Sequence, residues 1–301
     1  MNQIKDRLQQ AYSEIKNDCA ITTAASKDFG IYLLNMLSSL HENFPNHPKV
    51  YVFDLGLTSS QRSELKGIPW VELREVPAFC PFYKLCWTWK PYIWNQPKQR
   101  YVLHIDSGVV VLRSLELWFL AIKKHGYLAF TQGQVLSEIT PFSYLELSEF
   151  KGHKINLESQ IFAAGVFGFD LKSKIGDAVR EALDLAKKGL TLGWSKKEFN
   201  RAKHFQEKVY QDCDCFRHDQ TLINLCLRKQ IANPVIRPLK KYLGVSSARD
   251  HVRQYLWHAR RKPSSLTHLW NNESADYMAF LTNRARYSLG KLKHNVFGAI
   301  K

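Results

Sequence analysis

The sequence predicts an α/β protein in which helices flank a single mixed, mostly parallel sheet, a Rossmann-like arrangement. Apolar, β-branched runs alternate with amphipathic stretches through the first half of the chain, and this order predicts parallel strands joined by right-handed crossovers. The run YVLHIDSGVVVL (residues 101–112) is apolar on both faces up to an acid, as in a buried strand. Because open α/β sheets bind ligands at the carboxyl ends of their strands, Asp106, Ser107 and Gly108 form the first candidate site.

The elements are expected in a regular order. An amphipathic helix over residues 2–16 forms an N-terminal element (1–17), and the main domain spans residues 18–262. Strands are expected at residues 19–24, 49–55, 71–76, 101–112, 127–131 and 161–171. Helices are expected from an Asp28 cap to Pro45, from about residue 60, at 82–95 with a break or kink at Pro91, and at 114–124, 177–188 and 217–230. Residues 132–157 lack a clear period and are expected to form a long loop with a short helix.

The bulk composition indicates a cytoplasmic globular protein. The 301 residues are 45% hydrophobic and 13% aromatic, enough for a sizeable core. No segment approaches the roughly 18 to 20 unbroken apolar residues that a membrane span needs. The N-terminus is charged and lacks the apolar centre of a signal peptide, so the six cysteines are expected to be reduced thiols.

The net charge of +16 is concentrated near the C-terminus. From Arg237 onward the chain carries 13 Lys/Arg against 3 Asp/Glu. Residues 284–301 interleave basic and apolar side chains without an acid, which suits a helix lying on an anionic membrane surface. We therefore expect a basic helical extension (263–301) and a peripheral location at the inner face of the plasma membrane. A soluble basic surface, or a helix packed back on the domain, is the alternative.

Four local signals carry the candidate chemistry, and each has a structural alternative. Lys90 lies in WTWKPYIW, where its stem could cover aromatic neighbours. Asp106 could be a strand-end cap, and the small residues of FAAGVFGFD (162–170) could serve tight packing. Asp219 and Gln220 open a helix, where they could act as N-terminal capping residues. His258 stands alone in the basic segment.

Several other site classes find no support in the sequence. Cys213, Cys215, Cys226 and His218 lack the paired spacing of a zinc site. No Gly-rich dinucleotide or P-loop motif and no nucleophile elbow occurs. No recognised nucleic-acid-binding motif accompanies the charge, so a nucleic-acid-binding protein is suggested by charge alone and is not the expected function.

Taken in order, the signals resemble the nucleotide-sugar glycosyltransferases of the GT-A fold, most closely the glycogenin-like and bacterial galactosyltransferase-like group. The resemblance covers about residues 18–262. Its components are an opening strand with hydroxyl residues (AITTAAS), an aromatic and Lys-containing helix, an apolar strand ending in an acid, the strand FAAGV, a D-Q pair, and a His in a basic, Pro-containing segment. The resemblance implies transfer of a sugar from a nucleotide-diphosphate donor to a glycan or lipid-linked acceptor.

The resemblance also implies roles for individual residues. In the family, a D-x-D motif holds Mn²⁺ or Mg²⁺ against the donor diphosphate, a role suited to a hard cation with oxygen ligands. Here Asp106 matches the first acid and Gly108 replaces the last, which leaves Asp106 and His258 as metal ligands. The remaining roles are as follows: Thr22, Thr23, Lys90, Ser107 and Gly108 bind the donor; Ala163, Ala164 and Gly165 face the sugar and acceptor; Asp219 and Gln220 lie near the reactive carbon, with Asp219 as base or orienting group.

The missing second acid motivates an alternative function. A degenerate protein of the same fold would bind a sugar nucleotide or a glycan without catalysis. Both functions place Asp106 at the binding edge of the sheet, and they differ in whether its carboxylate is needed for a reaction.

Overall fold

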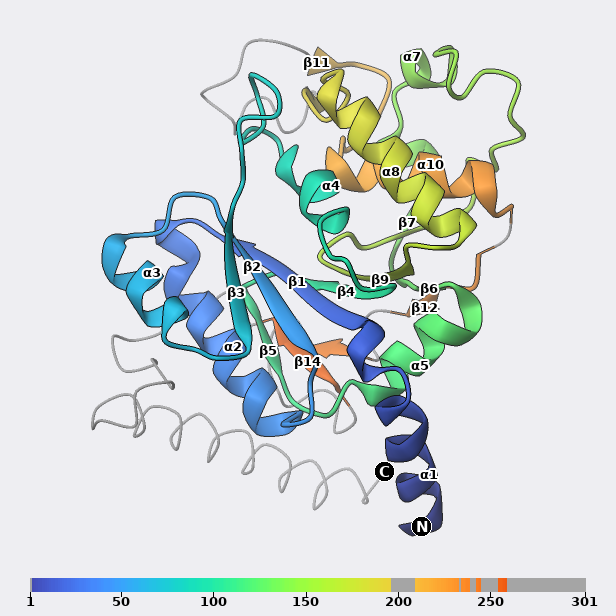
Figure 1. Ribbon diagram of the computed structural model, residues 1–301. Coiled ribbons are helices and arrows are strands. Elements are labelled where there is room, and N and C mark those ends of the chain that lie inside the picture. The colour runs from blue at the N-terminus through green and yellow to red at the C-terminus, as the bar shows by residue number, and fades with distance from the viewer. Residues whose placement is uncertain (1, 196–208, 233, 239–241, 245–253, 259–301) are drawn as a thin grey trace, which may run out of the picture.

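The structure is a computed structural model, and it describes residues 2–195, 209–232, 234–238, 242–244 and 254–258 (Figure 1). The expected basic extension, 263–301, lies outside these residues. None of the helices in the described ranges is both long enough and apolar enough to span a membrane.

A six-stranded mixed sheet forms the centre of the molecule, in the order β3-β2-β1-β4-β9-β6. The first four of these strands are parallel, and β9 is antiparallel to both of its neighbours. This confirms the predicted mixed, mostly parallel sheet flanked by helices. The strand bounds are β1 Cys19–Ala25, β2 Lys49–Asp54, β3 Val71–Glu75, β4 Tyr101–Ile105, β9 Val166–Asp170 and β6 Tyr127–Leu128.

Three small sheets accompany the central one. The first is β13-β14-β5, the second is β12-β7-β8, and the third is the pair β10-β11. Their bounds are β5 Val109–Val111, β7 Phe130–Val135, β8 Gln160–Phe162, β10 Trp194–Ser195, β11 Val209–Tyr210, β12 Arg237–Pro238, β13 Leu243–Gly244 and β14 Leu256–His258.

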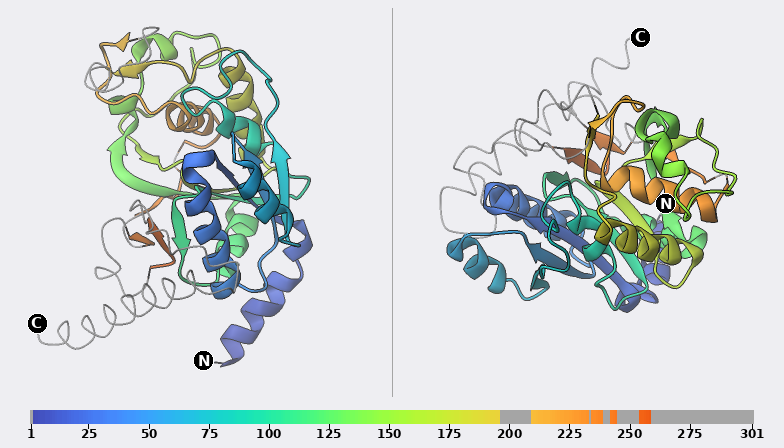
Figure 2. Two further views of the ribbon diagram at one scale, coloured as in Figure 1. Left: turned by 90° about the vertical axis from the view of Figure 1, so that its left-hand side faces the viewer. Right: turned by 90° about the horizontal axis from the view of Figure 1, so that it is seen from above.

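Helices cover both faces of the central sheet (Figures 1 and 2). The first face packs against α1 Asn2–Ser13, α2 Gly30–Asn43, α3 Ser59–Lys66 and α5 Glu116–His125. The second face packs against α4 Trp89–Trp94, α8 Lys174–Lys187 and α10 Asp219–Gln230, with the short helices α6 Leu136–Ile139 and α7 Phe142–Leu145 nearby. Because successive strand residues point to opposite faces, β1 supplies Ile21 to the first layer and Ala20 to the second.

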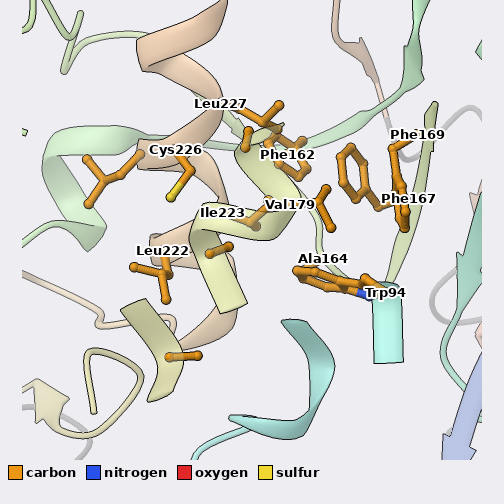
Figure 3. Packing of buried hydrophobic residues seen from close by; sticks show 14 of the residues in the cluster. Trp94, Phe162, Ala164, Phe167, Phe169, Val179, Leu222, Ile223, Cys226 and Leu227 are labelled. Atoms are coloured by element: carbon orange, nitrogen blue, oxygen red, sulfur yellow. The ribbon is translucent and has the colours of Figure 1, made fainter. Parts of the chain in front are cut away.

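The second layer is the larger aromatic core. Figure 3 shows Trp94, Phe167 and Phe169 beside Val179 of α8 and Ile223 of α10. All five side chains are buried. This packing fixes α4 and α10 on the same face of the sheet, and the first turns of these two helices carry Lys90 and Asp219.

Several expected element bounds are wrong. Asp28 lies in a 3₁₀ turn, and α2 begins after Phe29 with no side-chain cap. Helix α4 begins only at Trp89, so Pro91 lies in its first turn, where proline fits without a kink. The long strand expected at 161–171 is two strands, β8 and β9, in different sheets, and the strand expected at 127–131 likewise divides between β6 and β7. Residues 132–157 contain the end of β7 as well as α6 and α7.

Candidate active site

Three charged side chains from separate elements meet at the carboxyl end of β4. The Lys90 ammonium lies 3.0 Å from Asp106 Oδ1 and 3.6 Å from Asp219 Oδ2. The Lys90 side chain is only 6% exposed and Asp219 is equally buried, whereas Asp106 is 35% exposed. The cluster is therefore closed on the α4 and α10 side and open to solvent beside Asp106.

The backbone around the cluster explains how these side chains converge. Asp106 directly follows β4, and its N–H donates to Gly165 O at 2.8 Å. A Cβ at Gly165 would lie 2.6 Å from Asp106 Oδ2, so only glycine leaves room for this carboxylate. The turns that precede Lys90 and Asp219 contain residues with positive φ, Trp87 at +55° and His218 at +49°. Bulky residues rarely adopt this conformation, and such strain concentrates at functional sites.

A buried histidine orients the Asp106 carboxylate. His104 Nε2 lies 3.1 Å from Asp106 Oδ1, and its Nδ1 lies 3.2 Å from Thr22 Oγ1 on the neighbouring strand β1. Because an ionised carboxylate only accepts, Nε2–H donates to Asp106 and the Thr22 hydroxyl donates to Nδ1. Burial lowers the pKa of His104, and the adjacent Asp106 opposes this only in part, so the ring is neutral at physiological pH.

The two carboxylates differ in their proton affinity. Burial would raise the pKa of Asp106, but the Lys90 charge and the His104 hydrogen bond together lower it. Burial raises the pKa of Asp219 to about 6, with the Asp106 charge adding to the rise and the Lys90 charge opposing it. Burial would lower the pKa of Lys90, but Asp106 and Asp219 raise it, so the amine stays protonated. Two acids with separated pKa values are typical of sites that move or hold protons.

Two buried polar atoms at the start of α10 lack a hydrogen-bond partner among the residues that the structure describes. They are Asp219 Oδ2, which lies beyond hydrogen-bond distance from Lys90, and Gln220 Nε2. Buried polar groups are paired in most native structures, so two unpaired atoms on consecutive residues of α10 are unusual and are typical of ligand sites.

The structure brings together only some of the sequence-predicted residues. Thr22 and Gly165 border the cluster, but Thr23 points to the opposite face of the sheet, where its hydroxyl is buried without a partner. Ala163 and Ala164 are buried in the first and second core layers, respectively. Both positions are compatible with packing, and the predicted contact of the two alanines with the sugar or acceptor stays a prediction.

The turn Ser107-Gly108 joins β4 to β5, and β5 leads toward the expected metal ligand His258. The backbone of His258, in β14, is paired with Val109 of β5. The His258 side chain lies outside the part of the chain that the structure describes. The strand register thus brings the His258 backbone near the Asp106 turn, and the metal-ligand role remains an expectation.

The described residues do not fit a Mn²⁺ or Mg²⁺ site on their own. Among them, no group of three His, Cys, Asp or Glu side chains is arranged to hold a metal ion. Asp106 is the one accessible carboxylate of the cluster, and the ammonium of Lys90 already lies 3.0 Å from it. A divalent cation on the same oxygen would meet a like charge at close range, a costly arrangement. None of the six cysteines, all of which lie in the described ranges, forms a disulfide.

Sequence reasoning missed His104. It is the single polar side chain in the strand YVLHI and is fully buried there. Side chains two residues apart in a strand lie on the same face, so a histidine two residues before an acid lies on the same face as that acid. This two-residue spacing was the sequence signal that could have identified His104.

Comparison with known proteins finds similarity only at the level of structure. No protein-family model and no curated protein matches the chain. The bifunctional glycosyltransferase WbbM, in its apo structure, matches with a TM-score of 0.55 and 12% identity, over 88% of this chain and 52% of that chain. The present chain thus spans about half the length of WbbM.

Two structures of the galactosyltransferase LgtC also match. The complex with donor and acceptor sugar analogues has a TM-score of 0.47 and 14% identity, and an active-site mutant has a TM-score of 0.45 and 15% identity. Each match covers 88% of this chain and 95% of the LgtC chain. The likeness to WbbM shows that the chain has the α/β fold of the GT-A type glycosyltransferases.

Proposed function

We propose that the protein is a glycosyltransferase that transfers a sugar from a nucleotide-diphosphate donor to a glycan or lipid-linked acceptor. The observation that supports it best is the convergence of Lys90, Asp106 and Asp219 at the carboxyl end of β4. In open α/β sheets this edge is where ligands bind. The fold alone would not carry the proposal, because one fold hosts many functions.

The charge of the cluster suggests which part of the donor it contacts. With His104 neutral, one ammonium and two carboxylates leave a net negative charge once Asp219 is ionised. Such a cluster repels a diphosphate but stabilises the positive charge that develops on an anomeric carbon as the sugar–phosphate bond breaks. We assign the transferred sugar to this cluster and the diphosphate to the adjoining Ser107-Gly108 turn.

Each residue then has a defined task. Lys90 donates hydrogen bonds to sugar oxygens and keeps both carboxylates in place. Asp219 accepts a hydrogen bond from a hydroxyl through its unpartnered Oδ2, and Gln220 donates one through Nε2. Thr22 and His104 hold the Asp106 carboxylate in a single orientation. No step in this scheme passes through a metal ion, because the described residues do not form a site for one.

A panel of nucleotide sugars tests the proposal. We expect the wild-type protein to bind at least one donor in calorimetry and to hydrolyse it slowly, or to transfer its sugar to an added glycan. Asp106→Asn should fold normally and lose turnover. If the wild type neither binds nor turns over any donor, with or without Mn²⁺, the proposal is wrong.

The second candidate is a protein of the same fold that binds a sugar nucleotide or a glycan without catalysis. The observation that favours it is Gly108, which offers no carboxylate where the resemblance expects a second acid. Donor binding that survives in Asp106→Asn, together with no turnover in either protein, would support this candidate.

The cellular setting belongs to the proposal as well. We place the protein in the cytoplasm, peripheral at the inner face of the plasma membrane, where a lipid-linked acceptor would be accessible. This rests on the basic and apolar pattern of residues 284–301, which lie outside the described part of the chain. Sedimentation with anionic vesicles, compared with a chain truncated after residue 262, tests it.

A further inference from the structure

Trp87 is an exposed aromatic residue held in a strained backbone. Its side chain is 43% exposed, the largest exposure of any described tryptophan. Trp87 and the preceding Cys86 both have positive φ, +55° and +47°. Two consecutive non-glycine residues in this conformation are energetically unfavourable, so the surrounding structure must hold them there.

The contact that holds the ring comes from the turn before α10. The rings of Trp87 and His218 are 5.0 Å apart at an interplanar angle of 36°. On its other side His218 is fixed by a hydrogen bond between Nδ1 and Thr191 O at 3.0 Å and by the Trp194 ring at 4.8 Å. Trp87 is therefore supported on one side by a rigid, buried partner, while much of its remaining surface meets solvent.

The position of this ring relative to the charged cluster is fixed by sequence neighbours. The Lys90 N–H donates to Trp87 O at 2.9 Å, and His218 directly precedes Asp219. Trp87 thus lies on the Asp219 side of the cluster. The contacts that lead toward β1, from Asp106 to His104 and Thr22, lie on the other side. The charged cluster would therefore lie between a ligand bound to Trp87 and a nucleotide bound on the β1 side.

An exposed, preorganised indole beside the charged cluster suits a sugar ring. Pyranose rings present flat C–H faces to an aromatic surface and hydroxyl groups around their edge. Tryptophan gives a large rigid contact area at low entropic cost. The charged cluster, to which we assign the transferred sugar, adjoins this ring through the Lys90 N–H that donates to Trp87 O and through Asp219, which follows His218.

We infer that Trp87 is a stacking platform for the acceptor, and that it binds a pyranose ring of a glycan rather than the donor nucleotide. This inference rests on the proposed function and deepens it by naming a residue that selects the acceptor class. A lipid-linked acceptor that the protein uses must then carry a sugar, because a bare lipid phosphate offers the ring no C–H face to stack on.

The test compares Trp87→Ala and Trp87→Phe with Leu117→Ala. Leu117 is 44% exposed and lies on α5, which packs against the other face of the sheet, so it controls for loss of an exposed apolar side chain. The probes are the donor identified by the nucleotide-sugar panel and a set of methyl pyranosides and disaccharides as acceptors. Thermal unfolding of each variant checks that the fold is retained.

We expect Trp87→Ala to raise the acceptor KM at least about tenfold, while the donor KM and donor hydrolysis change less than about twofold. Trp87→Phe should fall between Trp87→Ala and the wild type, and Leu117→Ala should match the wild type. An unchanged acceptor KM in Trp87→Ala would overturn the inference, as would a rise confined to the donor KM.

A binding measurement keeps this test independent of turnover. In protein labelled with 5-fluorotryptophan, the ¹⁹F resonance that disappears in Trp87→Phe belongs to Trp87. We expect this resonance to shift with millimolar sugar from the panel. If no donor binds but this resonance shifts, the proposed transfer is wrong and a glycan platform stands. If a donor binds but no sugar shifts the resonance, the inference about Trp87 is wrong.

Discussion

The two ends of the β4–β9 strand pair carry two very different ion pairs. At one end Arg100 donates hydrogen bonds to both carboxylate oxygens of Asp170 at 2.8 to 3.0 Å. The backbone N–H of Lys172 donates a further hydrogen bond to Asp170 Oδ1 at 2.9 Å. At the other end Asp106 and Asp219 share the single ammonium of Lys90. One acceptor of this second cluster remains unpartnered.

The difference separates a structural ion pair from a binding site. The Arg100–Asp170 pair is complete within the chain, with one cation for one anion and 41% of the Arg100 side chain exposed. In the Lys90 cluster, Lys90 and Asp219 are buried, acids outnumber cations, and Asp219 Oδ2 has no hydrogen-bond partner among the described residues. A ligand that donates a hydrogen bond to this oxygen would therefore stabilise the cluster.

The largest effect should come from removing the two cations in turn. Lys90→Met leaves two carboxylates close together with no counter-charge, and we expect the free energy of unfolding to fall by about 3–5 kcal/mol. Arg100→Met removes a half-exposed partner from a carboxylate that keeps a backbone donor, and should cost about 1–2 kcal/mol. Urea titration at neutral pH measures both.

The same pair of variants separates the functions of the two ends. Sugar transfer should be abolished in Lys90→Met and retained in Arg100→Met. Equal losses of stability, or a loss of transfer in Arg100→Met alone, would contradict the assignment of the Lys90 end as the active one.

Two glycines, one directly before β9 and one within it, extend the comparison. In Gly165→Ala the new Cβ would lie 2.6 Å from Asp106 Oδ2, and in Gly168→Ala it would lie 2.4 Å from Ile122 Cδ1 in the core. We expect Gly165→Ala to lower the transfer rate about 100-fold by displacing the carboxylate, at little cost in stability. Gly168→Ala should instead cost about 1–3 kcal/mol by overpacking. Transfer kinetics should show the larger loss for Gly165→Ala, and thermal denaturation should show the larger loss for Gly168→Ala. If both variants lose the same amount of activity and of stability, Gly165 has no special role at the site.

Asp219 should show the cost of the incomplete cluster as a pH dependence. Its folded-state pKa is raised to about 6 from an ordinary value of 3.8, so the folded state holds the proton more tightly than the unfolded state. Stability should therefore fall as pH rises from about 4 to about 6 and stay lower above that range, by on the order of 3 kcal/mol. Asp219→Asn removes this loss and is expected to be more stable than wild type at pH 7.5, but not at pH 4, and inactive in transfer. Denaturant titrations across this range measure the effect, and a wild-type advantage at pH 7.5 would contradict it.

The smallest effect comes from two neighbouring threonines on opposite faces of β1. Thr22→Val removes the donor to His104 Nδ1 and should cost about 1 kcal/mol and several-fold in transfer rate. Thr23→Val removes a buried hydroxyl that has no partner and should be neutral or slightly stabilising. The two variants are isosteric, so a similar loss of activity in both would show that His104 does not depend on Thr22.

The central sheet and most helices could be predicted from the sequence because they follow from periodicity. The apolar runs at β1, β2 and β4 are local signals and were sufficient there, whereas the expected start of α8 at residue 177 missed its Ser173 cap. Asp106 and Asp219 were selected through their positions at element ends and Lys90 through the aromatic helix of the resemblance, and the structure brings these three together.

The remainder depends on contacts that no local window contains. The late start of α4 follows from positive φ at Cys86 and Trp87, and that strain is held by the ring contact with His218, far along the chain. The break between β8 and β9 arises because the chain changes sheets there. Thr22 and Thr23 lie on opposite faces of β1, and the residue on the face that α4 covers is the one near the site. The sequence does not show which face α4 covers, because that depends on how the helix packs on the sheet.

The spacing of the cluster residues along the chain has a consequence for the order of folding. The cluster and its supports come from residue 22, residues 90 to 106, residue 165 and residue 219, so its contacts close very long loops. Long loop closure slows folding, and α10 delivers the second carboxylate after every strand of the central sheet has left the ribosome. A nascent chain that ends before Asp219 carries one ammonium, on Lys90, and one carboxylate, on Asp106. The excess negative charge of the cluster arises only once Asp219 has been synthesised.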